Sequence, residues 1–440
     1  MTAAEPSHDR LARRLGLADA VAIGLAAMIG AGVFAVWAPA AQAAGAGLLI
    51  GLAIAAFVAF ANASSSAQLA ARYPESGGAY RYGRERLGAW PGFLAGWSFV
   101  IGKTASCAAM ALTAAAYLVP PEWQKPAAVI AVVALVVVNL LGVTRTARVG
   151  AVLVTAVLIV LALVVVAGVA TIVAGGGAVS ADPGADAAKA LPFRGGGAYG
   201  VLQSAALLFF AFAGYARIAT LGEEVREPSR TIPRAIGISL LVVVVVYAAV
   251  GLAALGALGP RSLAASDAPL SDVVATAGWL WAQPIVGVAA GVAALGALLA
   301  LLAGIGRTSL AMARDGELPR PLAAVHPRFR VPWIAEITVG VVIIALVLAV
   351  DLRGAIGFSS FGVLLYYLVA NAAAVTQPPS ERRVPRWLSI AGAIGCLVLV
   401  AALPVASIAA GLIVLAVGAA YRLVSGARRS RRPAGDGSPT

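Results

Sequence analysis

The chain has few charged residues. Only 12% of its 440 residues are charged, whereas 61% are hydrophobic, and the mean hydropathy is +0.93. Soluble domains carry about a quarter charged residues, so this composition indicates an integral membrane protein.

Residue types that carry out chemistry are also scarce. Cys107 and Cys396 lie in apolar segments, which predicts small core residues and no disulfide framework. The two histidines, His8 and His326, fall in polar segments, and no spacing matches a metal-ligand motif, so we expect no cofactor and no metal. Enzymes embedded in membranes usually need positioned carboxylates, histidines or a metal, and channels need a ring of carbonyls or charges. Neither pattern is present.

The net charge of +13 does not indicate nucleic-acid binding, because the basic residues are distributed by side. Most of the 32 Lys and Arg residues fall in loops on one predicted side. The loops of the other side carry Lys125, Lys189, Arg194, Arg261 and Arg353. This is the positive-inside bias. We therefore expect a multi-pass protein of the cytoplasmic (plasma) membrane of a bacterium, with both termini cytoplasmic. We read the first apolar segment as an uncleaved span and not as a signal peptide.

Apolar segments of about 20 residues predict an all-α membrane protein with twelve transmembrane helices. The predicted spans are Leu17–Ala43, Ala46–Ala70, Pro91–Val119, Pro126–Val143, Val149–Ala174, Tyr199–Leu221, Ala235–Leu258, Pro284–Ala313, Trp333–Val350, Ile356–Ala374, Trp387–Pro404 and Val405–Leu423. The resulting segments are a cytoplasmic tail (1–16), a five-helix repeat (17–174), an external linker (175–198), a second five-helix repeat (199–375), helices 11 and 12 (376–424) and a disordered cytoplasmic tail (425–440).

Glycines interrupt the first and the sixth predicted spans. The first break reads MIGAGVF over Met28–Phe34, and the second reads FFAFAGY over Phe209–Tyr215. Each glycine in a helix interior costs about 1 kcal/mol relative to alanine, and an unwound turn in lipid is tolerated only where protein buries it or it lines a cavity. Broken helices in corresponding positions of two halves indicate a transporter's binding site near the midplane. The two sets of five spans would have inverted topology. Amides at one half-helix end attract a carboxylate and carbonyls at the other hold a cation, which suits a zwitterionic amino acid.

These breaks and two further motifs resemble the amino acid–polyamine–organocation (APC) transporters, especially bacterial amino acid permeases akin to cationic amino acid transporters. The matching pieces are IGAGVF (Ile29–Phe34), FFAFAGY (Phe209–Tyr215), GEEVREPSRTIPR (Gly222–Arg234), and MARDGELP (Met312–Pro319) with HPRFRVP (His326–Pro332). The resemblance implies a leucine-transporter-type fold, a 5+5 inverted repeat plus two C-terminal helices.

The resemblance also implies the site residues. The substrate carboxylate is expected at the amides of Gly30, Ala31 and Gly32, and its amino group at carbonyls near Phe210, Ala211 and Ala213, with Ile29 as a further residue. Phe210 or Phe212 is expected in a gate over the substrate. Ordinary helix packing is the alternative for these aromatics, and we favour it for Phe209. Small-residue packing is the alternative for the glycines.

One lysine lies inside a span. Proton-coupled relatives place a lysine in the fifth span, where this chain has Val157 and no charge. Lys103 lies instead in the third span, about 18 Å along the helix from Pro91 and close to the middle of the bilayer. A lysine at this depth costs about 2.5–3.5 kcal/mol, so we treat Lys103 as a coupling residue. The alternative is a lysine that only holds the bundle together. A fixed charge there would disfavour cationic substrates.

The other polar residues in the spans have weaker claims. Arg217 and Glu224 are predicted to form an ion pair at the inner gate. Asn139, Asn371 and Gln203 are predicted to make hydrogen bonds between helices. The sequence therefore predicts an amino acid transporter, with proton-coupled import as the first interpretation and exchange of amino acids or polyamines as the alternative. It leaves open the amino acid transported and the oligomeric state.

Overall fold

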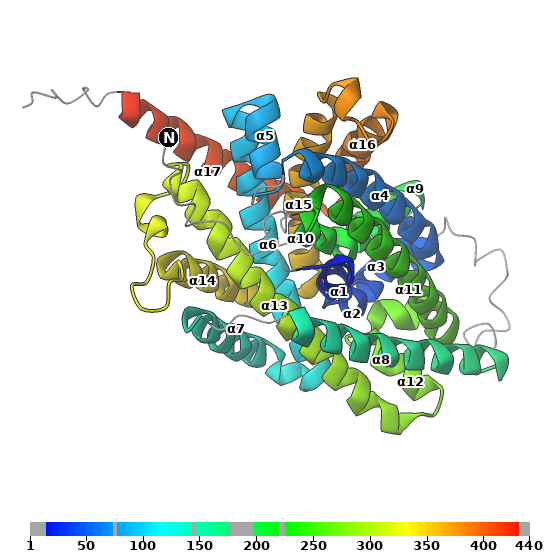
Figure 1. The fold of residues 1–440 in the computed structure, drawn as a ribbon. Helices are drawn as coiled ribbons and strands as arrows, with labels where there is room; N and C mark the ends of the chain where they lie inside the picture. The colour runs from blue at the N-terminus through cyan, green and yellow to red at the C-terminus, as the bar shows by residue number, and fades with distance from the viewer. Residues whose placement is uncertain (1–14, 74–76, 143–146, 177–196, 220–224, 431–440) are drawn as a thin grey trace, which may run out of the picture.

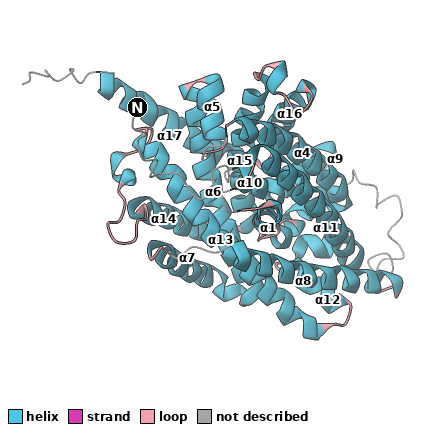
Figure 2. Cartoon of the chain, viewed as in Figure 1, coloured by secondary structure: helices cyan, strands magenta, loops and turns pink. Residues whose placement is uncertain are grey.

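The computed structural model describes residues 15–73, 77–142, 147–176, 197–219 and 225–430. Within these ranges the chain is helical and contains no strand, as the sequence predicted. Figures 1 and 2 show a bundle in which α1 is surrounded by other helices. Leu15 and Val225 meet in an isolated bridge, which holds the start of the first helix beside the loop after the sixth predicted span.

The helices follow the predicted spans closely. In chain order they are α1 (Leu17–Met28), α2 (Gly32–Ala35), α3 (Trp37–Ala44), α4 (Leu48–Arg72), α5 (Ala79–Leu87), α6 (Ala89–Leu118), α7 (Gln124–Leu140), α8 (Ala147–Val173), α9 (Gly197–Phe212), α10 (Ala216–Ala219), α11 (Pro228–Ala265), α12 (Pro269–Thr276), α13 (Gln283–Arg314), α14 (Trp333–Ala349), α15 (Leu352–Val375), α16 (Arg386–Ala402) and α17 (Val405–Ser430).

Length and composition let many of these helices cross a membrane. Ten helical segments of the described ranges are long and apolar enough to do so. Two more, α14 and α16, are apolar but have only 17 residues each. Both coincide with predicted spans. Because they are shorter than the other ten segments, the total of twelve transmembrane helices stays a prediction.

Burial separates central from peripheral helices. In α6, α9 and α15, 72–78% of the residues in the most apolar stretch are buried, compared with 17% in α7 and α17. Large apolar side chains such as Val152, Ile159 and Leu241 are exposed on the outside of the bundle. An apolar exterior is what a lipid-facing surface requires. The central helices are therefore the ones that can form a site shielded from lipid.

The helix ends differ from prediction in two places. The seventh span, predicted as Ala235–Leu258, begins at Pro228 and continues through a kink at Gly259 to Ala265. Gly259 has φ 72°, a conformation that glycine adopts without strain, and Pro260 supplies no N–H to the preceding turn. At the C-terminus, α17 continues to Ser430, so it overlaps the tail predicted from residue 425. Most of the predicted linker and of both predicted tails lies outside the described residues.

Candidate functional site

The structure breaks the helix at both predicted places. Helix α1 ends at Met28, and helical geometry resumes at Gly32, where the amides of Phe34 and Ala35 both donate to the carbonyl of Ala31. Helix α9 ends at Phe212 and continues as a 3₁₀ turn over Ala213–Tyr215 before α10. A tighter turn inside a helix often marks a functional hinge. The glycine-based prediction of two breaks is confirmed.

The two breaks lie in direct backbone contact. A Cβ atom on Gly32 would lie 2.7 Å from the Cα atom of Ala211, and one on Gly214 would lie 2.3 Å from the carbonyl oxygen of Ala27. Real Cβ atoms do not approach other atoms so closely, so only glycine fits at either position. The chain halves therefore meet where the α-helix of each one is interrupted.

The residues predicted to bind substrate are buried around this contact. They are Ile29, Gly30, Ala31, Gly32, Phe210, Ala211 and Ala213. Phe212, predicted in a gate, is fully buried and its ring packs against Tyr247 at 5.1 Å between centroids. Phe209 packs against Tyr367, as ordinary core packing predicted. The structure brings these residues together, and their roles toward substrate stay predictions.

Three side chains on neighbouring helices donate to carbonyls of the breaks. The Tyr247 hydroxyl on α11 lies 2.6 Å from the carbonyl oxygen of Met28 and 3.1 Å from that of Ala211. Lys103 Nζ on α6 and the Tyr367 hydroxyl on α15 each lie 3.2 Å from the carbonyl oxygen of Ala213. Lys103, predicted for coupling, therefore reaches a carbonyl predicted for the substrate amino group.

Sequence reasoning missed Tyr247 and Tyr367. Tyr247 is the one tyrosine of α11, and Tyr367 follows Tyr366 in α15. By sequence, the hydroxyl of either is indistinguishable from that of any core tyrosine. Their positions deep within predicted spans could have identified them, because a fully buried hydroxyl needs a hydrogen-bond acceptor.

The predicted inner-gate pair is described only in part. Arg217 lies in α10 and is partly buried, whereas Glu224 lies outside the described residues. In the fifth span, α8, Val157 is buried. Asn371 and Gln203 make the predicted interhelical bonds, from Asn371 to the side chain of Asn62 and from Gln203 to the carbonyl of Ala402.

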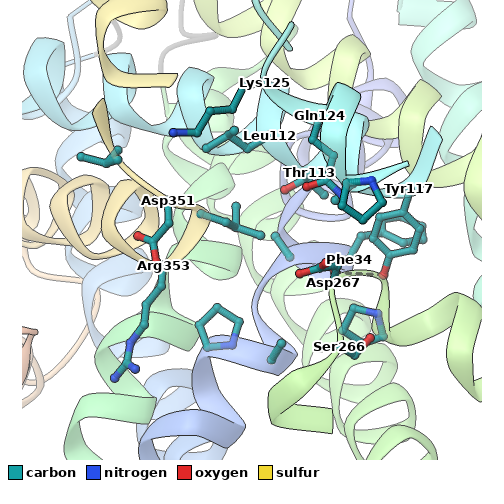
Figure 3. Close-up of a pocket in the computed structure, with 18 of the residues that line it drawn as sticks. Phe34, Leu112, Thr113, Tyr117, Gln124, Lys125, Ser266, Asp267, Asp351 and Arg353 are labelled. Carbon is teal, nitrogen blue, oxygen red and sulfur yellow. Dashed lines mark hydrogen bonds between the residues drawn. The ribbon is translucent and has the colours of Figure 1, made fainter. Parts of the chain in front are cut away.

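A cavity of about 410 Å³ lies on the face that the charge distribution predicted to be external. Figure 3 shows Phe34 and Tyr117 on one side of it and Asp351 and Arg353 on the other. Both signs of charge line the cavity, through Glu122, Lys125, Asp267, Asp351 and Arg353. None of the predicted substrate-binding residues lines it.

Tyr117 lines this cavity beside Phe34, the last residue of the first break. Its hydroxyl donates to the carbonyl of Phe34 in α2 at 3.1 Å and accepts from the amide of Leu270 in α12 at 3.2 Å. Its ring packs edge-on against Phe34, with centroids 5.6 Å apart. One side chain of α6 thus ties together the first broken span and the short helix after the α11 kink.

A cluster of ionic contacts lies at the opposite end of the bundle. Glu317, in the MARDGELP motif, accepts from Arg84 of α5 at 2.6 Å and from Arg422 of α17 at 3.1 Å. The Tyr80 hydroxyl donates to Asp315 at 2.5 Å. Burial raises the pKa of Glu317, while the guanidinium groups of Arg422 and Arg84 oppose that rise. Through these contacts, Asp315 and Glu317 join α5 and α17 to the end of α13.

The described residues contain no group of three or more His, Cys, Asp or Glu side chains placed to hold a metal ion. The polar groups around the breaks are hydroxyls, one amino group and backbone carbonyls, which can bind and position a small polar molecule.

Comparison with known proteins agrees with the geometry. A family model described as amino acid permease matches residues 15–424. An uncharacterized transporter of Mycobacterium tuberculosis is 56% identical over 433 residues, which cover 96% of this chain and 94% of the relative. The branched-chain amino acid permease BcaP of Bacillus subtilis is 28% identical, covering 89% of this chain and 86% of the relative. The chloroplastic cationic amino acid transporter 7 of Arabidopsis thaliana is 29% identical, covering 83% and 66%.

The family model spans nearly the whole chain, and it matches the family that the four motifs resemble. The names of the relatives describe transporters. The chain belongs to the amino acid permease family of the APC transporters and is a multi-pass membrane transporter.

Proposed function

We propose that this protein is a secondary active transporter that imports amino acids across the bacterial cytoplasmic membrane by alternating access, coupled to protons. The observation that carries this proposal is the backbone contact between the two breaks, at Gly32 with Ala211 and at Gly214 with Ala27. Two unwound turns that meet inside a bundle offer unpaired amides from one half-helix and carbonyls from another.

A zwitterionic amino acid fits the polarity of this arrangement. The amides at the start of α2, around Gly30, Ala31 and Gly32, would receive the carboxylate. The carbonyls of the second break, near Phe210, Ala211 and Ala213, would receive the amino group, with Ile29 beside them. An apolar side chain on the substrate would suit the surrounding alanine and phenylalanine residues.

The position of Lys103 favours neutral amino acids over cationic amino acids as substrates. Its amino group is buried and contacts the Ala213 carbonyl, so a substrate side chain of positive charge would meet like charge there. The branched-chain amino acid permease of Bacillus subtilis is a relative whose name fits this direction. We further propose Lys103 as the proton-coupling residue, since a change of its charge alters its bond to the second break.

The proposed architecture places twelve transmembrane helices in a 5+5 inverted repeat with two additional helices, and both termini in the cytoplasm. The helices α14 and α16 would complete the twelve, because an apolar helix of 17 residues is at the short end of what spans a bilayer. The cavity beside Tyr117 would then face outward.

Uptake by purified protein in liposomes tests the proposal. Labelled amino acids are offered in pools with an inward proton gradient, without a gradient, and to vesicles preloaded with unlabelled amino acids. We expect uptake without preload that rises with the gradient. Uptake only into preloaded vesicles would establish the exchanger instead, and no uptake by folded protein in any mode would refute amino acid transport.

A further inference from the structure

The carbonyls of both breaks receive hydrogen bonds from the chain itself. We call Lys103, Tyr247 and Tyr367 the internal donors. Tyr247 has a single hydroxyl proton to share between the carbonyls of Met28 and Ala211. Lys103 is 6% exposed, Tyr247 1% and Tyr367 0%, so water does not make the hydrogen bonds to these carbonyls.

The internal donors stand on helices outside the broken spans. Lys103 is on α6, Tyr247 on α11 and Tyr367 on α15. A carbonyl oxygen has two lone pairs, and Lys103 and Tyr367 together use both of those on Ala213. Of the acceptors that we assign to the substrate amino group, Ala211 and Ala213 thus already have donors.

This has a consequence for the transport cycle. A buried carbonyl that receives no hydrogen bond costs free energy. If only the substrate can donate to the carbonyls of a binding site, the transporter closes readily only when substrate is bound. Such a carrier exchanges one substrate for another. A site whose carbonyls have donors from the chain can close without substrate, and this return step is what net transport requires.

We infer that the internal donors replace the substrate amino group during the return step, so that this protein carries out net transport and not obligatory exchange. The inference rests on the proposed function, and it assigns Tyr247 and Tyr367 as positioning residues for the break carbonyls. Tyr247 is the sole side-chain donor described for Met28 and Ala211, whereas Ala213 has two donors.

The test compares two transport modes in liposomes at equal pH on both sides. Net uptake is measured into vesicles without amino acid, and exchange is measured into vesicles loaded with the same unlabelled amino acid. Tyr247→Phe keeps the ring and removes the hydroxyl from the carbonyls of Met28 and Ala211. Tyr199→Phe is the matched control, because it also removes one tyrosine hydroxyl, and this half-exposed hydroxyl in the first turn of α9 donates to the carbonyl of Leu403 and not to a break.

For Tyr247→Phe we expect net uptake to fall roughly tenfold while exchange stays within about twofold of the unmodified protein, as expected for orphaned buried acceptors. Tyr199→Phe should retain both modes. Equal loss of both modes in Tyr247→Phe, or no loss of net uptake, would overturn the inference. Exchange without net uptake by the unmodified protein would overturn it too while leaving amino acid transport intact, whereas no transport in either mode would overturn the proposed function itself.

A second variant keeps the test decisive if Tyr247→Phe does not fold. Lys103→Met combined with Tyr367→Phe removes both donors from the Ala213 carbonyl. We expect the same selective loss of net uptake, and preserved net uptake in this double variant would contradict the inference.

Discussion

At Gly32 the two chain halves approach each other through their backbones. Its hydrogen atoms face Ala211, and a methyl group in their place would lie 2.7 Å from the Ala211 Cα atom and 2.9 Å from its Cβ atom. Neither atom can move without shifting the break in α9. The absence of a side chain is therefore part of the site geometry.

Gly32→Ala is predicted to lower the initial uptake rate by roughly tenfold or more, because overpacking of a rigid contact costs about 1–3 kcal/mol. The control is Gly304→Ala in α13, where a Cβ atom would meet nothing within 4 Å. Gly304→Ala should leave uptake unchanged. Rates are measured in liposomes containing equal amounts of each protein, and normal transport by Gly32→Ala would disprove the close-contact interpretation.

Lys103 is the residue on which the proposed proton coupling depends. Lys103→Met is predicted to abolish the stimulation of uptake by an inward proton gradient, because methionine keeps the length of the side chain and loses the charge. Lys125→Met is the control, since Lys125 donates to the Leu348 carbonyl from an exposed position beside the outer cavity. Gradient stimulation that persists in Lys103→Met would limit Lys103 to a packing role.

Among the structural elements, α6, α2 and α12 meet through Tyr117 beside the cavity, and we interpret this contact as a closure between the cavity and the breaks. A single hydroxyl, that of Tyr117, bonds to Phe34 and to Leu270. Helix α12 follows the kink at Gly259 and is a short element separate from the main body of α11. The closure therefore depends on a few polar contacts and one aromatic pair.

Tyr117→Phe is predicted to open this closure more often. The reporter is Thr113→Cys at the cavity wall, 1% exposed, in a background with Cys107 and Cys396 replaced by alanine. A membrane-impermeant thiol reagent should label it several times faster when Tyr117→Phe is added. Labelling at the same rate would show that the hydroxyl does not hold the closure.

Helices α5 and α17 depend on the Glu317 contacts. Glu317→Ala is predicted to lower stability by roughly 1.5–3 kcal/mol, because it leaves Arg84 and Arg422 without the carboxylate that both contact. The control is Glu381→Ala, whose bond to Arg72 is largely exposed and therefore contributes little. In detergent, Glu317→Ala should have a lower apparent melting temperature than Glu381→Ala. Equal melting temperatures would show that the Glu317 contacts contribute no more to stability than an exposed ion pair does.

Across the whole molecule, the sequence predicted the spans and both breaks because helix periodicity, hydropathy and glycine placement are local properties. The contact of Gly32 with Ala211, the donors Tyr247 and Tyr367, and the partners of Glu317 join residues far apart in the chain. Without knowledge of which helices pack together, a buried tyrosine hydroxyl cannot be assigned an acceptor. The cavity closed by Tyr117 was missed for the same reason.

We propose that the two breaks together hold an amino acid by both of its charged groups. The most direct measurement is competition against uptake of a transported amino acid by analogues of the same side chain, one lacking the amino group and one with the carboxylate converted to an amide. We expect each analogue to compete at least about tenfold more weakly than the intact amino acid, since each leaves one break without its partner. Equal competition by either analogue would show that the corresponding break does not bind substrate and would contradict the claim.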